Sequence, residues 1–385
     1  MEIKPEIETF AKIKVVGVGG SGGSAVNRMI TGGVKGVEFI AINTDVQALH
    51  YNLAPTKLHI GKTTTRGLGA GMDPEIGRRA AEESEDEIRE LLKGADMIFI
   101  TCGLGGGTGS GAAPVVAEIA RDLGALTVAV VTRPFAFEGA ARRKVSEGAY
   151  NNLISNVDTI ITIENDRLLQ IIDQKTSLLD AFQIVDDVLR QGVAGISELI
   201  TVPGLINVDF ADVKTIMKDQ GSALMGIGTG NGENRASDAA KQAISSPLLE
   251  ISMEGAKGIL FIVTGGPSLS MYEINEAAKT VTSSADPEAK IIFGANIDAT
   301  LGDDVRITVV ATGFDQGKKR FIPEETKAYV PPEPVVKASS YSRPVEVKVE
   351  TPAKAPAAST PDPFKAQEPV QDLDIPAFIR KKMGN

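Results

Sequence analysis

Two glycine-rich segments are the residues of this chain best suited to chemistry. One reads GVGGSGG (17–23) and the other GLGGGTGSG (103–111), and each follows an apolar run and precedes a helix-forming run. Glycine permits tight turns and lets backbone N–H groups approach an anion, and a helix N-terminus adds partial positive charge. The pattern therefore predicts two phosphate-binding loops, each between a strand and a helix.

Hydroxyl groups and a missing lysine refine this prediction. Thr108 and Ser110 are expected to add hydrogen bonds to phosphate oxygens. The motif G-x-x-x-x-G-K-[ST] is absent, because GKT at 61–63 has Thr56 where glycine is required. Phosphate charge must then be met by backbone N–H groups, helix ends and a cation such as Mg²⁺. No dedicated protein site for a metal is predicted.

The first segment alone leaves other functions open. It matches G-x-G-x-x-G, which favours an NAD-dependent dehydrogenase with Asp45 as the acid after the second strand. That reading leaves the second segment unexplained, whereas two loops at one sheet edge fit a nucleoside triphosphate held from both sides. The dehydrogenase and a nucleotide-gated scaffold without turnover remain the alternatives.

Apolar runs predict the elements that position these loops. Strands are expected at 12–19, 37–45, 95–101, 126–135 and 159–165, and helices at 23–33, 74–95, 112–124 and about 139–156. Residues 46–73 are expected to form a long loop. The strands are continuously apolar and alternate with helices, which indicates a parallel sheet buried on both faces. The N-terminal half is therefore predicted to be a Rossmann-like α/β domain.

The second half is predicted to hold a long central helix and a smaller α/β domain. Residues 178–200 are apolar around much of a helix, so that helix must be packed from more than one side. Beyond it, helices are expected near 211–218, 235–246 and 270–281, and strands at 258–265, 290–296 and 305–314.

The domain boundaries follow from these elements and from composition. Residues 321–370 hold 10 of the 20 prolines and no glycine, which predicts disorder. The following DLDIPAFIRKK is apolar again, and we interpret it as a docking peptide, with a frayed terminus as the alternative. The predicted parts are a flexible N-terminus (1–10), a nucleotide-binding domain (11–177), a central helix (178–202), a C-terminal domain (203–316), a linker (317–369) and a C-terminal peptide (370–385).

Composition excludes several classes of function. The net charge of −10 and the absence of Trp argue against nucleic-acid binding by a basic or base-stacking surface. Cys102 is the only cysteine and the N-terminus is not secretory in type, so the chain is predicted to be cytoplasmic. No apolar run reaches the length of a membrane helix, so any membrane contact is expected to be indirect.

Several longer motifs resemble the tubulin/FtsZ family of GTPases. GGGTGSG fits the family signature G-G-G-T-G-[ST]-G, and the similarity continues through GVGGSGGSAVN, AINTD, GLGAG, PFAFEGAARR, NVDFADV, AISSPLLE and LDIPAFIRKK. The chain departs from the common family pattern at Ser21, Ser24 and Ser110, all of which keep the backbone N–H. The resemblance implies a GTPase that assembles head to tail into protofilaments and forms the cytokinetic ring of bacterial cell division at mid-cell.

The resemblance also implies roles for particular residues. Residues 20–24 and 107–109 would bind the α- and β-phosphates, Ala70 and Gly71 the γ-phosphate, and Glu138 and Arg142 the ribose. Phe182 would stack on the base, and Asn165 and Asp186 would accept hydrogen bonds from guanine, whose N–H pair adenine lacks. The full predicted nucleotide site is Gly19, Gly20, Ser21, Gly22, Gly23, Ser24, Asn43, Asp45, Ala70, Gly71, Gly103, Gly105, Gly106, Gly107, Thr108, Gly109, Thr132, Glu138, Arg142, Asn165, Phe182 and Asp186.

The predicted catalytic group is NVDFADV (207–213). Taken alone, Asp212 could be a charge that favours a helix N-terminus. However, the segment follows the central helix at the end away from the nucleotide, so it cannot reach the phosphates of a nucleotide bound by the same chain. The resemblance implies that Asn207, Asp209 and Asp212 act on the GTP of a neighbouring subunit by orienting the attacking water, so assembly activates hydrolysis.

The resemblance implies the partners as well. They are further copies of the chain, division-site regulators, and membrane-tethering adaptors such as FtsA. The adaptors would bind the C-terminal peptide through Asp374, Ile375, Pro376, Phe378, Ile379 and Arg380. GTP and GDP would be substrate and product, Mg²⁺ would accompany them, and the interface leaves room for a monovalent cation.

Overall fold

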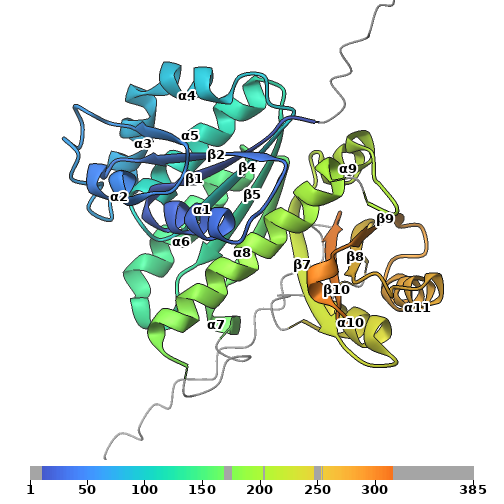
Figure 1. Cartoon of the computed structure of the whole chain (residues 1–385). Coiled ribbons are helices and arrows are strands. Elements are labelled where there is room, and N and C mark those ends of the chain that lie inside the picture. The colour runs from blue at the N-terminus through green and yellow to red at the C-terminus, as the bar shows by residue number, and fades with distance from the viewer. Residues whose placement is uncertain (1–10, 169–175, 203, 247–252, 254, 315–385) are drawn as a thin grey trace, which may run out of the picture. The chain divides into compact units, whose positions relative to one another are not determined.

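The N-terminal half is built around parallel strands. The computed structural model describes residues 11–314 apart from 169–175, 203, 247–252 and 254. Its strands lie in the order β3-β2-β1-β4-β5-β6-β7-β10-β8-β9, and the pairings from β3 through to β7 are all parallel (Figure 1). The first six are β1 (Ile13–Val18), β2 (Val37–Asn43), β3 (Thr56–His59), β4 (Met97–Gly103), β5 (Leu126–Arg133) and β6 (Thr159–Glu164).

Helices cover both faces of this sheet, which explains why its strands are continuously apolar. Alternate residues such as Val15 and Phe99 pack in one core with α1 (Gly19–Thr31) and α8 (Leu178–Thr201). Their neighbours Val16 and Ile100 pack in a second core against α3 (Pro74–Glu83), α4 (Glu85–Leu92), α5 (Thr108–Asp122) and α6 (Ala140–Ile154). The predicted Rossmann-like domain is confirmed.

Two local predictions in this half were wrong. The expected loop at 46–73 contains α2 (Val46–Tyr51) and strand β3, which adds an edge to the sheet beside β2. The single helix expected at 74–95 is broken at Ser84, which is buried and non-helical, with φ −113° and ψ 23°. The Ser84 hydroxyl accepts a hydrogen bond from the N–H of Gly61, so a tertiary contact fixes the break.

The long central helix is confirmed as α8, which contacts α1 on one side and β9 on the other (Figure 1). The second group of strands is mixed: β10 pairs antiparallel with both β7 and β8, and β8 pairs parallel with β9. The remaining elements are a 3₁₀ turn (Ala136–Glu138), α7 (Asn165–Leu168), α9 (Phe210–Met217), β7 (Gly221–Gly230), α10 (Arg235–Ile244), β8 (Gly258–Gly265), α11 (Met271–Thr282), β9 (Lys290–Ile297), a 3₁₀ turn (Ala299–Leu301) and β10 (Val305–Thr312).

Strand β7 was not predicted from the sequence. Its sequence GSALMGIGTG is poor in the apolar residues that usually mark a strand. Gly226, Gly228 and Gly230 lie on one face, and a Cβ at each would stand 2.0–2.1 Å from a carbonyl oxygen of α10. Because these residues have no side chain, α10 can pack directly on the strand backbone. The need for glycine at these positions therefore comes from tertiary packing.

Candidate nucleotide site

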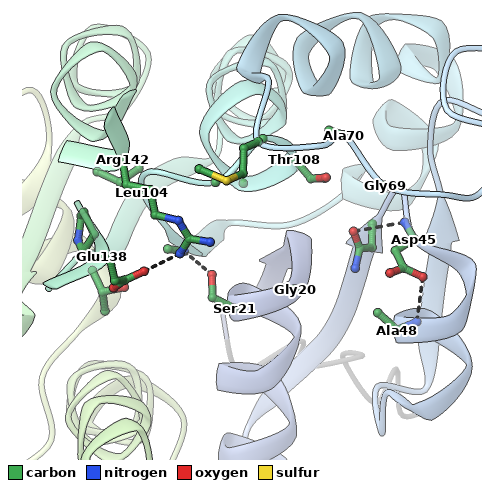
Figure 2. A pocket seen from close by; sticks show the side chains of 18 of the residues that line it. Gly20, Ser21, Asp45, Ala48, Gly69, Ala70, Leu104, Thr108, Glu138 and Arg142 are labelled. Carbon is green, nitrogen blue, oxygen red and sulfur yellow. Dashed lines mark hydrogen bonds and ion pairs between the residues drawn. The ribbon is translucent and has the colours of Figure 1, made fainter. Parts of the chain in front are cut away.

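A cavity of about 580 Å³ lies at the carboxyl edge of the parallel strands. Figure 2 shows Ser21 of α1, Thr108 of α5 and the pair Glu138 and Arg142 around the same space. The structure brings most of the predicted nucleotide residues into its lining: Gly20, Ser21, Asn43, Asp45, Ala70, Gly71, Gly103, Gly106, Gly107, Thr108, Gly109, Thr132, Glu138, Arg142, Asn165, Phe182 and Asp186.

Five predicted residues do not line the cavity: Gly19, Gly22, Gly23, Ser24 and Gly105. Three of the glycines among them are required by packing or backbone geometry. A Cβ on Gly22 would stand 2.3 Å from the carbonyl oxygen of Thr101, and Gly19 and Gly105 have positive φ values of 76° and 102°. Gly22 therefore allows α1 to lie close to β4, and Gly19 and Gly105 shape the two loops behind the cavity surface.

A second group of glycines leaves space open. Gly69 and Gly71 also line the cavity, but their positive φ values of 85° and 56° favour glycine by themselves. A Cβ placed on Gly20 or Gly106 would meet no atom within 4 Å, and neither residue has a positive φ, although both line the cavity. At these positions the absence of a side chain is not needed for packing within the chain. It keeps backbone and space available to a bound molecule.

Two helices point uncapped N-termini at this space. Neither α1 nor α5 has a side-chain N-cap hydrogen bond or an acidic residue in its first turn. By contrast, α2, α3 and α9 are capped by the carboxylates of Asp45, Asp73 and Asp209. The first-turn N–H groups of α1 and α5 and their dipoles are thus unopposed by local carboxylates, which suits a phosphate chain.

Hydroxyl groups hold the two loops in place. Ser21 Oγ accepts a hydrogen bond of 2.8 Å from the N–H of Gly103, and Thr108 Oγ1 shares one of 2.6 Å with Thr44 Oγ1. Ser110 Oγ accepts from the N–H of Gly105 at 2.9 Å and is 2% exposed, outside the cavity lining. The expectation that Ser110 binds phosphate is therefore wrong, since its hydroxyl is used to close its own loop.

The far end of the cavity is suited to a base that donates hydrogen bonds. Asn165 is 5% exposed, and its Oδ1 has no hydrogen-bond partner among the described residues. Burial raises the pKa of the Asp186 carboxyl to about 6, opposed in part by the positive charge of Arg28. The ring of Phe182 meets Phe135 edge-on, with centroids 5.6 Å apart, and stays 40% exposed. Two acceptors and a partly exposed aromatic ring thus line the same cavity.

The other charged residues of the lining already have partners. Glu138 forms an ion pair with Arg142 one turn away (Figure 2). Its Oε1 accepts a hydrogen bond of 2.9 Å from the N–H of Phe135. Asp45 caps α2 by accepting from the N–H groups of Gln47 and Ala48. These contacts fix the side chains before any ligand binds.

Sequence reasoning missed seven lining residues: Ala48, Gly69, Met72, Leu104, Pro134, Val185 and Leu189. Val185 and Leu189 could have been found from Phe182, because residues three and seven positions later lie on the same helix face. Gly69 and Leu104 adjoin predicted residues. Asp187, the neighbour of Asp186, lies outside the lining and accepts a hydrogen bond of 2.7 Å from Arg190.

No metal centre is formed by the chain's own ligands in the part the structure describes, where no three His, Cys, Asp or Glu side chains are grouped to hold an ion. The carboxylate of Asp45, which lines the cavity, is already committed to capping α2. A Mg²⁺ ion here would fit as a companion of phosphate oxygens and water, which is its usual mode of binding.

The predicted catalytic residues lie elsewhere. Asn207, Asp209 and Asp212 are exposed and absent from the cavity lining. The carboxylate of Asp209 caps α9, and Asn207 Oδ1 accepts from the N–H of Gly204 at 2.6 Å. At about 1.5 Å per residue, the part of α8 between Asp186 and Thr201 is roughly 22 Å long, and these residues follow its far end.

Comparison with known proteins identifies the family. Residues 12–173 match the GTPase domain of the tubulin/FtsZ family, and residues 221–315 match the C-terminal domain of the FtsZ family. An empty FtsZ dimer from M. jannaschii is 49% identical, with a TM-score of 0.77 over 80% of this chain and 89% of that chain. A GTPγS-bound CetZ2 protofilament from Haloferax volcanii, at 21% identity and a TM-score of 0.68 over 80% and 94%, shares the fold.

The fold and the cavity thus define a nucleotide-binding α/β protein of the tubulin type. The chain belongs to the tubulin/FtsZ family of GTPases, and both of its domains match FtsZ proteins. This membership confirms the resemblance drawn from the sequence and removes the dehydrogenase alternative. Among the described residues, no helix is long and apolar enough to cross a membrane.

Proposed function

We propose that this chain is a self-assembling GTPase whose active site forms between two subunits stacked head to tail. The observation that carries the proposal is the separation of the cavity from Asn207, Asp209 and Asp212 along α8. One subunit would bind GTP in its cavity, and the next would supply these residues. Such a contact is heterologous and does not close on itself, so it produces filaments.

The phosphates would lie on the N–H groups of the two glycine loops and the N-termini of α1 and α5. Ala70 and Gly71 would approach the γ-phosphate, where the lack of a Cβ on Gly71 leaves room. Asp209 and Asp212 of the neighbouring subunit would orient the attacking water. The chemistry is then positioning and charge stabilisation, as in other phosphoryl transfers.

Guanine would occupy the end of the cavity beside Phe182. The Oδ1 of Asn165, which has no partner among the described residues, and the partly buried carboxylate of Asp186 would accept hydrogen bonds from N1–H and the 2-amino group. Adenine offers an acceptor at the N1 position, so it would bring one acceptor against another and leave Asn165 and Asp186 without donors. The same arrangement therefore accounts for the binding of guanine and for its selection over adenine.

Exposed apolar residues around the cavity support burial of this face by another subunit. Leu68, Phe137 and Leu179 are 86%, 63% and 68% exposed, and each is within three residues of one that lines the cavity. On the opposite loop, Leu205 is 62% exposed and lies two residues before Asn207. The FtsZ relative from M. jannaschii is described as a dimer, which is consistent with self-association.

The cellular part of the proposal rests on family membership and the predicted peptide. We propose that the filaments form the division ring at mid-cell, on the inner face of the membrane. The C-terminal peptide (370–385) would join them to adaptors such as FtsA and to division regulators; with the linker, it lies outside the described residues. A monovalent cation at the subunit interface would complement the acids there.

Turnover as a function of concentration tests the proposal directly. Phosphate release and light scattering are measured together with GTP, GDP and ATP over a range of protein concentrations. We expect GTP-specific assembly above a threshold, with turnover per subunit rising steeply across it. A turnover per subunit that is the same in dilute, unassembled protein would refute the shared active site.

A further inference from the structure

Helix α9 carries the proposed catalytic acids at its start and is held by two threonines at its end. The last carbonyls of a helix have no partner within the helix. Here Thr159 Oγ1 donates a hydrogen bond to the carbonyl oxygen of Met217, and Thr312 Oγ1 donates one of 2.9 Å to that of Ile216. Both threonines are 0% exposed, so water cannot replace these donors.

The two threonines come from different domains. Thr312 ends β10 in the C-terminal domain, whereas Thr159 begins β6 in the nucleotide domain. Strand β6 runs from Thr159 to Glu164, and the next residue is Asn165, which lines the cavity. One short buried strand therefore joins the base end of the cavity to the end of α9.

Further hydrogen bonds make the connection between the start of β6 and the end of α9 stiff. Asp158, beside Thr159, is 5% exposed, and its carboxylate accepts from the N–H groups of Thr127 at 2.9 Å and Asp219 at 3.3 Å. Its carbonyl accepts from Gln220 and Gly221, both at 2.9 Å. The turn after α9 is thus bonded to the nucleotide domain through backbone and side chain.

The N-terminal end of the segment 207–213, which carries the proposed catalytic residues, is anchored separately. Ile206 and Ala295 exchange two backbone hydrogen bonds of 3.1 Å, which tie the approach to the segment to β9. Between Ile206 and the buried Val213, the exposed residues include Asn207, Asp209 and Asp212. The direction in which these side chains project is therefore set by how α9 is seated.

We propose that Thr159 is a positioning residue for hydrolysis: its hydroxyl seats α9 so that Asp209 and Asp212 meet the nucleotide of the adjacent subunit. This inference rests on the proposed function and adds that the nucleotide domain itself, through β6, sets the placement of the acids that its own subunit donates. A displacement of about 1 Å at reacting groups can cost up to a hundredfold in rate.

The test compares three variants of the full-length chain. Thr159→Val keeps the shape and removes the donor, and Thr159→Ser keeps the hydroxyl. Thr162→Val is the matched control, because Thr162 lies in the same strand and its buried Oγ1 has no hydrogen-bond partner among the described residues. GTP affinity of dilute protein, pelleted polymer, and turnover at saturating GTP are measured for each.

We expect Thr159→Val to bind GTP within about twofold of wild type and still assemble, while its turnover falls about tenfold. Thr159→Ser should recover most of that loss, and Thr162→Val should match wild type. Wild-type turnover in Thr159→Val, an equal loss in Thr162→Val, or a loss of GTP affinity as large as the loss of turnover would overturn the inference.

Two further variants keep the result interpretable. If Thr159→Val does not fold, Thr312→Val removes the neighbouring bond to α9 and carries the same expectation of retained binding and reduced turnover. Asp212→Ala tests the proposed function separately. Wild-type turnover in Asp212→Ala would refute the catalytic role of the loop, whereas normal turnover in Thr159→Val alone would refute only the positioning role.

Discussion

Oδ1 of Asn165 and the carboxylate of Asp186 line the same cavity from α7 and α8, and no described residue donates a hydrogen bond to either. A buried acceptor without a donor, such as Asn165 Oδ1, costs a folded chain about 1–3 kcal/mol. A ligand that supplies donors to Asn165 and to the partly buried Asp186 offsets that cost, and guanine carries two such donors.

Nucleotide affinity should depend on pH through Asp186. The free carboxyl has a pKa raised to about 6 by burial, and hydrogen bonds from guanine would lower that pKa in the complex. Binding then expels a proton below pH 6, so affinity for GDP should be constant above that pH and fall by up to about tenfold per unit below it. Fluorescent-nucleotide titrations between pH 5 and 8 measure this.

The control for the pH prediction is Asp186→Asn, which has no carboxyl to titrate. It should bind guanine nucleotides more weakly, discriminate less against adenine nucleotides, and show a flat pH profile between 5 and 7. An equally flat profile in the wild-type protein would show that Asp186 does not face the base.

Cavity glycines and packing glycines should respond differently to a methyl group. Gly106→Ala places a Cβ in open space, so the melting temperature should stay close to that of wild type while GTP affinity falls at least about tenfold, which corresponds to about 1.4 kcal/mol. Gly22→Ala places its Cβ 2.3 Å from the carbonyl oxygen of Thr101 and should destabilise the fold by about 1–3 kcal/mol or more.

Thermal unfolding and nucleotide binding of these two variants separate the effects. Full GTP affinity in Gly106→Ala would mean that the nucleotide does not approach this loop. An unchanged melting temperature in Gly22→Ala would contradict the close contact between α1 and β4.

Removing the acid at the start of α9 should separate binding from catalysis. Asp212 is exposed and outside the cavity, so Asp212→Ala should bind GTP as wild type does and unfold at nearly the same temperature. Its steady-state phosphate release should fall by at least about a hundredfold, because the water-orienting group is lost. Weakened GTP binding by dilute Asp212→Ala would instead place this residue in its own subunit's pocket.

The packing of α10 on β7 predicts a strong effect from a small change. A Cβ at Gly228 would stand 2.0 Å from the carbonyl oxygen of Ala239, so Gly228→Ala should cost about 1–3 kcal/mol or more, measured by denaturant unfolding. Gly148→Ala makes a useful comparison, since a Cβ there meets no atom within 4 Å and the residue lies inside helix α6 with no positive φ. Equal stability of Gly228→Ala and wild type would exclude the close packing.

The sequence could predict much of the site because local chemistry specified it. Runs such as MIFITCG can be recognised as strands from the local sequence alone, and a glycine loop between such a run and a helix is a phosphate-binding signal in itself. The loop residues Gly106, Gly107 and Thr108, predicted to bind the nucleotide, accordingly line the cavity. By the same reasoning Ser110 was assigned to phosphate, and that assignment failed because its partner, the N–H of Gly105, is fixed by the fold of the loop.

Local patterns of residue types were enough to predict the strand-helix alternation, the two glycine loops and the long helix α8, since each depends on residues close together in the chain. Packing in three dimensions determines which glycines face the cavity and which face a carbonyl, that GSALMGIGTG is a strand, and that Thr159 reaches α9. Those outcomes depend on contacts between residues far apart in the chain, such as Thr159 with Met217, and no local pattern of residue types encodes such distances.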